Sequence, residues 1–306
     1  MSTSVVSYLI ALYNKEKYIL DCVDSILSEA STSIEIEICI VDDGSSDNSL
    51  SLVTEKYSNI ANVKIESFEA NKGKNAAYNR AFAMSSGSYI CIFGADDVVV
   101  PGRTKQLLAL SNQEKKSVYG KLLPFTGSIE DISFNIKPPK KIKCDFYKNI
   151  IQNMLSGGGG LLKREHAELA FPIPEHLPFE DWWISYHLLK SNLVTTLDRY
   201  VTLYRIHDSN DIGSLDGSYR TIKNDYLRHF EYLKEFEKIA TSEKELATIQ
   251  KSKQLRQSFL GNYNKANITN LSLGLTDFKI IVFNLFGARS FYKIKDALIS
   301  SKKRYG

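Results

Sequence analysis

Apolar residues in the first hundred positions of the chain follow two alternating periodicities. Short continuous apolar runs, typical of buried strands, are separated by segments whose apolar residues recur every three or four positions, as on one face of a helix. The predicted strands are 5–12, 34–41, 63–68 and 89–93, and the predicted helices are 16–30, 47–57 and 75–84. This alternation predicts an α/β fold with a mostly parallel central sheet flanked by helices.

The pattern changes after Pro101, where prolines and glycines interrupt the chain more often. Segment 146–155 predicts a helix that runs into a group of glycines, and the last part of the chain is helical in pattern. We therefore divide the sequence into an α/β domain over residues 1–215 and a C-terminal, basic helical region over residues 216–306.

Acidic residues gather where two of the predicted strands end. Asp42 and Asp43 follow the second strand, and Asp96 and Asp97 follow the fourth. Ligands of parallel sheets bind beyond the carboxyl ends of the strands, so both pairs stand where a site is expected. Adjacent carboxylates repel each other unless a cation or turn donors compensate, and Mg²⁺ and Mn²⁺ prefer one or two carboxylates together with substrate phosphates. The structural alternatives are helix capping and an acidic turn before Pro101.

Three later features are also candidates. Asp181 follows Glu180 at the predicted start of a helix, where a carboxylate serves either as a general base or as a favourable partner of the helix dipole. His207 is either a third metal ligand or a structural histidine. The glycine run 157–160 allows a close approach of backbone to ligand or a flexible turn, and neither a P-loop nor a GxGxxG fingerprint is present.

Composition and cysteine spacing narrow the class of protein. The chain has 306 residues, of which 43% are hydrophobic and 24% charged, as in ordinary globular proteins. Its four cysteines are scattered, and no two of them have CxxC spacing, which predicts reduced core residues in a cytoplasmic protein. The apolar start has neither the basic flank nor the cleavage site of a signal peptide. No stretch approaches the ~18 apolar residues of a membrane span.

The positive charge is concentrated near the C-terminus. Residues 251–306 contain eleven Lys or Arg against two Asp, although the whole chain carries only +4. A basic end attracts an anionic partner, and the first 250 residues show no nucleic-acid module, so we expect no nucleic acid. We expect an anionic membrane surface instead, with the short apolar segment 278–286 resting on it. The alternative is that this segment packs in a core or in a homo-oligomer interface.

The motifs occur in a specific order along the chain. They are Leu12-Tyr13-Asn14, Val41-Asp42-Asp43-Gly44-Ser45-Ser46-Asp47, Asn71-Lys72-Gly73, Ser86-Gly87-Ser88-Tyr89-Ile90, Ala95-Asp96-Asp97 with Pro101, Glu180-Asp181 and Tyr204-Arg205-Ile206-His207. Over roughly residues 4–210 this set resembles the family 2 glycosyltransferases of the GT-A fold. The resemblance implies an inverting, metal-dependent hexosyl- or N-acetylhexosaminyltransferase of polysaccharide biosynthesis (capsule or O-antigen). Its donor would be a nucleotide-diphosphate sugar, most often a UDP-sugar.

The resemblance also implies roles for individual residues. Residues 1–101 would bind the nucleotide sugar and residues 102–215 the acceptor, a glycan or a lipid-linked oligosaccharide at the inner face of the membrane. Asp181 matches the catalytic base. Nucleotide-sugar-binding positions match Ala11, Tyr13, Asp43, Asn71 and Asp96. The Mn²⁺ or Mg²⁺ ligands match Asp96, Asp97 and His207.

Three departures from the family pattern keep other functions open. Ala11 stands where proline or threonine is usual, and Gly94 replaces the first acid of the DxD element. In addition, the Ala-Arg-Asn that follows the Asn-Lys-Gly element in the family reads Ala77-Tyr78-Asn79 here, with arginine only at Arg80. The second departure favours a non-catalytic glycan-binding or scaffold protein on the same fold. A sugar-nucleotide nucleotidyltransferase is a further alternative, but it would need a glycine-rich basic loop after the first strand, and segment 12–16 contains no glycine.

Overall fold

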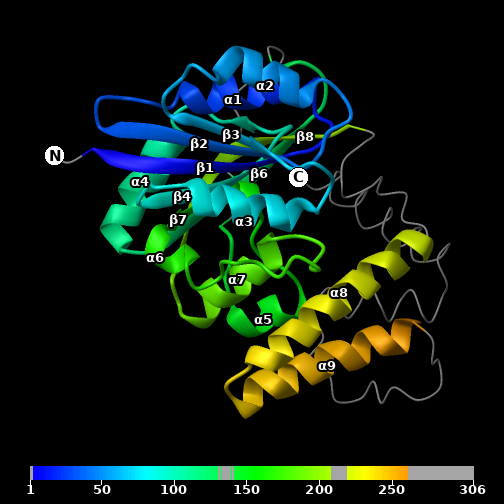
Figure 1. Ribbon diagram of the computed structural model, residues 1–306. Helices are drawn as coiled ribbons and strands as arrows, with labels where there is room; N and C mark the ends of the chain where they lie inside the picture. Colours follow the sequence, from blue (N-terminus) through cyan, green and yellow to red (C-terminus); the bar gives the residue numbers. More distant parts are fainter. Residues whose placement is uncertain (1–2, 130–131, 133–138, 140, 208–218, 261–306) are drawn as a thin grey trace, which may run out of the picture. The chain divides into compact units, whose positions relative to one another are not determined.

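The computed structural model describes residues 3–129, 132, 139, 141–207 and 219–260 (Figure 1). The chain divides into two compact units. The first runs to residue 207 without 150–152, and the second contains 150–152 and the residues from 208 onward. Each unit is considered by itself below.

The first unit is built on a mixed sheet that has eight strands within the described residues. The strand order is β3-β2-β1-β4-β7-β6-β8-β5. The strands are β1 Ser4–Leu12, β2 Ile34–Asp42, β3 Val63–Ser67, β4 Tyr89–Gly94, β5 Val98–Val99, β6 Ser117–Phe125, β7 Gly160–Lys163 and β8 Val194–Arg205. The first four strands run parallel, and β7 pairs with β4 in the antiparallel direction. The predicted α/β fold is confirmed, and all four strands predicted in the first hundred residues are present.

Helices cover both faces of the parallel part of this sheet. The helices of the first unit are α1 Ile19–Leu27, α2 Ser49–Tyr57, α3 Lys74–Met84, α4 Arg103–Glu114, α5 Phe146–Ile151, α6 Arg164–Ala167 and α7 Asp181–Lys190, except that the last two residues of α5 belong to the second unit. In Figure 1, α1 and α2 lie on one face and α3 on the other. Alternate β1 side chains, from Val6 to Leu12, pack with the buried faces of α1, α2 and α4 in one core cluster. The period-two alternation of a strand places these side chains on one face of the sheet, where they form a core with the three helices.

Two predicted helices are shorter than their periodicity indicated: the helix expected over 16–30 spans Ile19–Leu27, and the helix expected over 146–155 also ends early. Segment 146–155 was expected to be helical throughout, but α5 ends at Ile151. Side-chain amides take over the backbone donors beyond that point, because Asn149 Oδ1 accepts the N–H of Met154 at 3.0 Å and Asn153 Oδ1 accepts that of Leu155 at 3.2 Å. Asparagine competes with helical hydrogen bonding in this way, so the prediction was wrong at its C-terminal end.

The second unit contains two adjacent helices, α8 Tyr219–Ile239 and α9 Glu243–Leu260 (Figure 1). Arg256 of α9 is buried and donates from Nε to His229 Nδ1 of α8 at 3.2 Å. Most of the basic end of the chain, with the apolar segment 278–286, lies outside the described residues. Among the helices that are described, none combines the length and the apolarity that crossing a bilayer requires.

Three of the four cysteines lie in the core, as predicted, and the fourth does not. Cys22, Cys39 and Cys91 are buried, Cys144 is half-buried, and all four are free thiols. They contribute to packing in the first unit, where burial raises the pKa of each thiol.

Candidate active site

The carboxyl ends of three parallel strands lie level at one edge of the sheet. In the register of the strands, Leu12 at the end of β1 pairs with Asp42 of β2, and Ala11 pairs with Gly94 of β4. The polar segments that follow β1, β2 and β4 therefore leave the sheet side by side. This is the edge at which ligands of parallel sheets bind.

The segment after β1 is fixed against the segment after β2 by side-chain hydrogen bonds. Asn14 adopts a left-handed backbone conformation (φ 51°), and its Oδ1 accepts the backbone N–H of Ser46 at 2.8 Å. Glu16 Oε2 accepts the N–H of Asn48 at 3.0 Å. These bonds hold the loop rigidly while Tyr13, whose side chain is 45% exposed, remains accessible at the edge.

Asp43 joins the end of β2 to the loop before α3. Its Oδ1 accepts the N–H of Lys72 at 2.7 Å and its Oδ2 that of Gly73 at 3.0 Å. Burial raises the pKa of this carboxyl, and the two backbone donors act in the opposite direction. Asn71, another predicted site residue, is exposed beside this loop, and a side chain at Gly44 would approach its backbone nitrogen to 2.8 Å. The close approach explains the glycine that follows the aspartate pair.

Asp96 lies between two basic side chains. Its Oδ2 is 2.7 Å from Lys15 Nζ and 2.9 Å from His207 Nε2. The His207 ring in turn stacks on Tyr18, with 4.7 Å between the ring centroids. Burial raises the pKa of Asp96, but Lys15 and His207 outweigh burial and lower the pKa below its usual value. The structure therefore brings together Asp96 and His207, which are far apart in the sequence.

Asp97 points to a different set of partners. Its Oδ1 accepts the backbone N–H of Arg205 at 3.1 Å, and the Arg205 guanidinium donates from Nε to the carbonyl of Asp96 at 3.0 Å. Burial, together with the neighbouring Asp96 charge, raises the pKa of Asp97 to about 8. Arg205 thus ties the end of β8 to the aspartate pair that follows β4.

The space above Gly94 is filled by the same two carboxylates. A Cβ at this position would lie 2.9 Å from Asp97 Oδ2 and 3.2 Å from Asp96 Oδ1. An acidic side chain at position 94, as in a full DxD element, would require both carboxylates to move. The two aspartates thus occupy the space that the side chain of the missing acid would need.

The residues at this edge fit a divalent cation whose coordination is completed by oxygens of a bound ligand. No group of three or more His, Cys, Asp or Glu residues within the described part of the chain is arranged to hold a metal by itself. Asp96 Oδ2 and His207 Nε2, at 2.9 Å, have about the ~3 Å separation of neighbouring ligands in an octahedral Mg²⁺ or Mn²⁺ site. Such ions use one or two protein ligands together with phosphate oxygens and water.

The glycine run brings the start of α7 to the same edge. A Cβ on Gly157 would lie 2.6 Å from Glu180 Oε1 and 3.7 Å from the Cβ of Asp181, and a Cβ on Gly158 would lie 3.6 Å from Asp97 Oδ2. The run therefore passes between the Glu180–Asp181 pair and Asp97. A side chain at Gly157 would require the Glu180 carboxylate to move, so the absence of a side chain there lets the run lie close to the acidic pair.

Asp181 is the first residue of α7 and is half-buried. Burial raises the pKa of its carboxyl above the usual range, and the charge of Glu180 raises it further, while Lys74 acts against both. Lys74 Nζ lies 3.5 Å from Glu180 Oε2. A carboxylate with a raised pKa at a site edge is suited to accept a proton near neutral pH.

Four basic residues that organise this edge were not found by sequence reasoning. Lys15 and Arg205 contact the aspartate pair, Lys74 contacts Glu180, and Arg103 donates from its second terminal nitrogen to the carbonyl of Gly160 at 2.8 Å. Arg205 belongs to the motif Tyr204-Arg205-Ile206-His207, but the motif by itself predicts no function for it. No spacing rule identifies the other three, because their partners come from distant segments.

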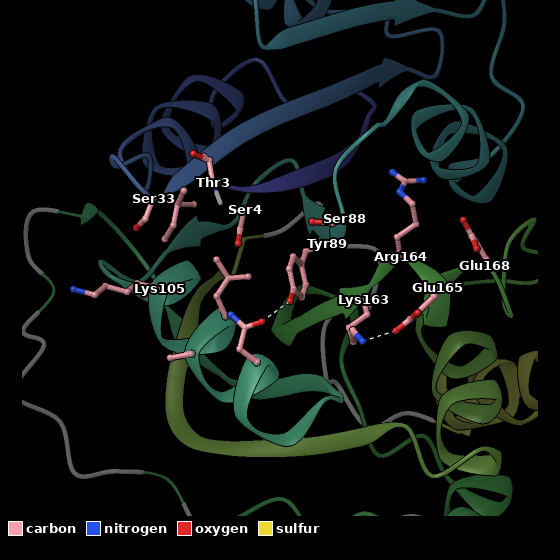
Figure 2. A pocket seen from close by; sticks show the side chains of 14 residues that line it. Thr3, Ser4, Ser33, Ser88, Tyr89, Lys105, Lys163, Arg164, Glu165 and Glu168 are labelled. Carbon is pink, nitrogen blue, oxygen red and sulfur yellow. Dashed lines mark hydrogen bonds and ion pairs between the residues drawn. The ribbon is translucent and has the colours of Figure 1, made fainter. Parts of the chain in front are cut away.

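A cavity of about 950 Å³ lies elsewhere in the first unit (Figure 2). Its lining includes Ser4, Ser33 and Ser88, which stand at the amino ends of β1, β2 and β4. Asp43 and Asp96 follow the carboxyl ends of the same sheet. The cavity is therefore separate from the acidic edge.

Fold and site together define an α/β protein of the GT-A class, with acidic residues from several loops at the carboxyl edge of its parallel strands. Residues 7–170 match the family described as Glycosyl transferase family 2. The chain belongs to this family, which confirms the resemblance inferred from the ordered motifs.

Individual relatives agree with this assignment. The chain is 28% identical over 214 residues to an uncharacterized glycosyltransferase of Nostoc sp., covering 67% of this chain and 66% of the relative. It is 40% identical over 97 residues to chondroitin synthase of Escherichia coli, covering 32% of this chain and 14% of that protein. The chain thus spans less than two thirds of the length of either relative.

A solved structure supports the fold. The crystal structure of residues 1–349 of Staphylococcus aureus TarS in complex with UDP-GlcNAc superposes with a TM-score of 0.61, covering 93% of this chain and 80% of that one at 20% identity. The sequence relative of the same name is poly(ribitol-phosphate) beta-N-acetylglucosaminyltransferase, 30% identical over 113 residues, which are 37% of this chain and 20% of that protein. At these identities the superposition shows a shared fold.

Proposed function

We propose that this chain is an inverting glycosyltransferase, which transfers a sugar from a nucleotide-diphosphate sugar to a hydroxyl group of a glycan or a lipid-linked oligosaccharide. The observation that carries the proposal is the meeting of three distant acids at one sheet edge. Asp43 lies after β2, Asp96 after β4 and Asp181 at the start of α7, and the glycine run 157–160 passes between the Glu180–Asp181 pair and Asp97, the neighbour of Asp96. The solved complex of TarS with UDP-GlcNAc favours a UDP-sugar as the donor.

The nucleotide would bind over the ends of β1 and β2. Tyr13 offers an exposed aromatic ring on which a base can stack. Asp43 is held by two backbone donors, so its remaining acceptor positions face a fixed direction and suit a base or ribose donor. Asn71 is exposed beside it, and the paired residues Ala11 and Gly94 put only small side chains at the ends of β1 and β4.

Asp96 and His207 would hold Mn²⁺ or Mg²⁺ together with the donor diphosphate. When bound, such an ion neutralises negative charge on the diphosphate and makes it a better leaving group. The chain prepares this position in two ways. Arg205 fixes the carbonyl of Asp96 and the side chain of Asp97, and Tyr18 orients the His207 ring by stacking.

Asp181 would remove the proton from the acceptor hydroxyl as its oxygen attacks the anomeric carbon from the face opposite the diphosphate. A single displacement of this kind inverts the configuration. The raised pKa of Asp181 makes the carboxylate a stronger base than an exposed aspartate. The sign of the pH dependence follows, because only the ionised carboxylate accepts a proton, so the rate falls as the pH drops through this raised pKa.

The test is Asp181→Asn in an assay of UDP release and of transferred sugar. We expect kcat to fall by ~10²–10⁴-fold, the usual contribution of a general base, with UDP binding unchanged. The matched control is Asp198→Asn, which changes the same group on an exposed part of β8. In the wild type, the rate should decrease below neutral pH and not only below pH ~4, the ordinary aspartate range.

Two results would contradict this role. Loss of UDP affinity in Asp181→Asn with kcat unchanged would make Asp181 a binding residue. A wild-type protein that binds glycans but neither transfers nor hydrolyses any UDP-sugar, with or without Mn²⁺, would support the non-catalytic alternative that Gly94 favours.

A further inference from the structure

Lys15 occupies a position that the proposed donor chemistry does not explain. Its ammonium group lies 2.7 Å from Asp96 Oδ2, the same oxygen that faces His207 Nε2 at 2.9 Å. Both charged side chains are largely shielded, with 15% of Lys15 and 13% of Asp96 exposed. The oxygen that is best placed to bind a divalent cation is therefore already paired with the singly charged ammonium group of Lys15.

The backbone of Lys15 cannot easily retreat from this position. Its N–H donates to Ser49 Oγ at 2.7 Å, and its carbonyl accepts the N–H groups of Tyr18 and Ile19 at 2.9 and 3.0 Å. The flanking residue Asn14 is bonded to the loop after β2 as well. If the ammonium left Asp96, it would stay at the same edge of the sheet, within the reach of its own side chain.

A shielded ammonium without a counter-charge is costly. A divalent ion that bound Asp96 alone would displace Lys15 and leave that charge unpaired. A diphosphate that arrives with the ion removes the cost, because its oxygens offer the displaced ammonium a new anionic partner. They also complete the coordination of an ion that, among the described residues, takes Asp96 and His207 as its ligands.

We propose that Lys15 and a divalent cation compete for Asp96 Oδ2, so that the ion binds tightly only together with the donor diphosphate. This inference rests on the proposed function and adds to it a residue that couples the two ligands. The coupling is reciprocal by linkage. The bound ion increases the affinity of the protein for the nucleotide diphosphate by the same factor as the bound nucleotide diphosphate increases its affinity for the ion. Binding of the ion without the donor is disfavoured, so the site at the sheet edge stays available for the donor diphosphate together with its cation.

The experiment measures Mn²⁺ affinity directly, by electron paramagnetic resonance of free Mn²⁺, with and without UDP. The variants are Lys15→Gln, which removes the charge, Lys15→Arg, which keeps it, and Lys17→Gln, which removes an exposed charge two residues away. Circular dichroism and thermal unfolding confirm that each variant is folded. The solution complex of Mn²⁺ with UDP is the same for all of them and cancels in the comparison.

We expect UDP to tighten Mn²⁺ binding to the wild type by a factor on the order of 10–100, the usual size of coupling between two sites. In Lys15→Gln, Mn²⁺ alone should bind more tightly by a factor on the order of 10, and the effect of UDP should shrink correspondingly. Lys15→Arg and Lys17→Gln should behave as the wild type.

The outcomes separate this inference from the proposed function. If Lys15→Gln and the wild type bind Mn²⁺ alone equally well, while UDP still tightens Mn²⁺ binding in both, competition by Lys15 is wrong and the metal-dependent donor site stands. If Lys17→Gln reproduces the effect of Lys15→Gln, the effect is one of general charge, and the inference is wrong as well. If no variant binds Mn²⁺ even with UDP, the metal-dependent function itself fails.

Discussion

Glu37 gives a stability prediction whose magnitude follows from its contacts. This carboxylate lies on β2, is only 5% exposed, and accepts hydrogen bonds from Ser7 Oγ, from Lys64 Nζ at 2.7 Å and from both the N–H and the hydroxyl of Ser86 at 2.8 Å. Burial raises its pKa, but these donors outweigh burial and lower the pKa from 4.5 to about 2. Because Ser86 precedes β4, the network anchors the strand that carries the aspartate pair.

A folded-state pKa below the unfolded value stabilises the protein above the unfolded pKa, and the stability is lost as the pH falls through the folded one. A decrease from 4.5 to about 2 corresponds to roughly 3 kcal/mol at pH 7. Glu37→Gln should therefore lower the free energy of unfolding by up to roughly 3 kcal/mol at pH 7. The difference from wild type should fall to less than half of that value by pH ~3.

Urea unfolding of both proteins between pH 3 and pH 7 measures this difference. The matched control is Glu35→Gln on the same strand, which removes the same charge from an exposed position and should change stability by less than ~0.5 kcal/mol. A difference between wild type and Glu37→Gln that does not vary with pH would refute the assignment of the stabilisation to the ionised carboxylate. Equal losses in Glu35→Gln and Glu37→Gln would refute the role of the buried network.

Two other predictions concern the ligands of the enzyme. Asp96→Asn should abolish sugar transfer and the Mn²⁺-dependent thermal stabilisation by UDP, while circular dichroism shows an intact fold. Full activity of this variant in the presence of a chelator would contradict metal-dependent donor binding. The full-length chain should float with anionic but not with neutral liposomes and should be released by salt, because residues 251–306 are basic and segment 278–286 is apolar; protein that stays in the soluble fraction under all conditions contradicts membrane association.

The sequence predicted the layout of the site better than its contacts. Two acidic pairs at strand ends were expected at one edge, and the register that pairs Leu12 with Asp42 and Ala11 with Gly94 places them there. This worked because parallel strands with short polar loops leave little freedom in where the chain continues. The assignment of Asp96, Asp97 and Asp181 to individual roles stays a prediction.

Side-chain direction could not be obtained in the same way. Asp96 and Asp97 are adjacent and chemically identical, yet Asp96 faces Lys15 and His207 while Asp97 accepts the N–H of Arg205. The difference arises from strand β8, which pairs with β5 directly after the aspartate pair and so brings Arg205 next to Asp97. The contact between β8 and the turn after β4 is a property of the tertiary fold and leaves no periodic signal in either segment.

The geometry of the edge depends on arginines as much as on acids. Arg205 donates to the carbonyl of Asp96, and Arg103, which is 1% exposed, donates to the carbonyls of Gly158 and Gly160 at 3.2 and 2.8 Å. Each guanidinium satisfies backbone oxygens of a loop that carries or borders an acid, and its fixed donor fork orients that loop. Lysine would keep the charge but lose the fork. Arg205 of β8 thus positions Asp96 through its backbone carbonyl, and Arg103 of α4 positions the glycine run that borders Asp97. Residues that are distant in the sequence therefore place the acids that stand at the strand ends.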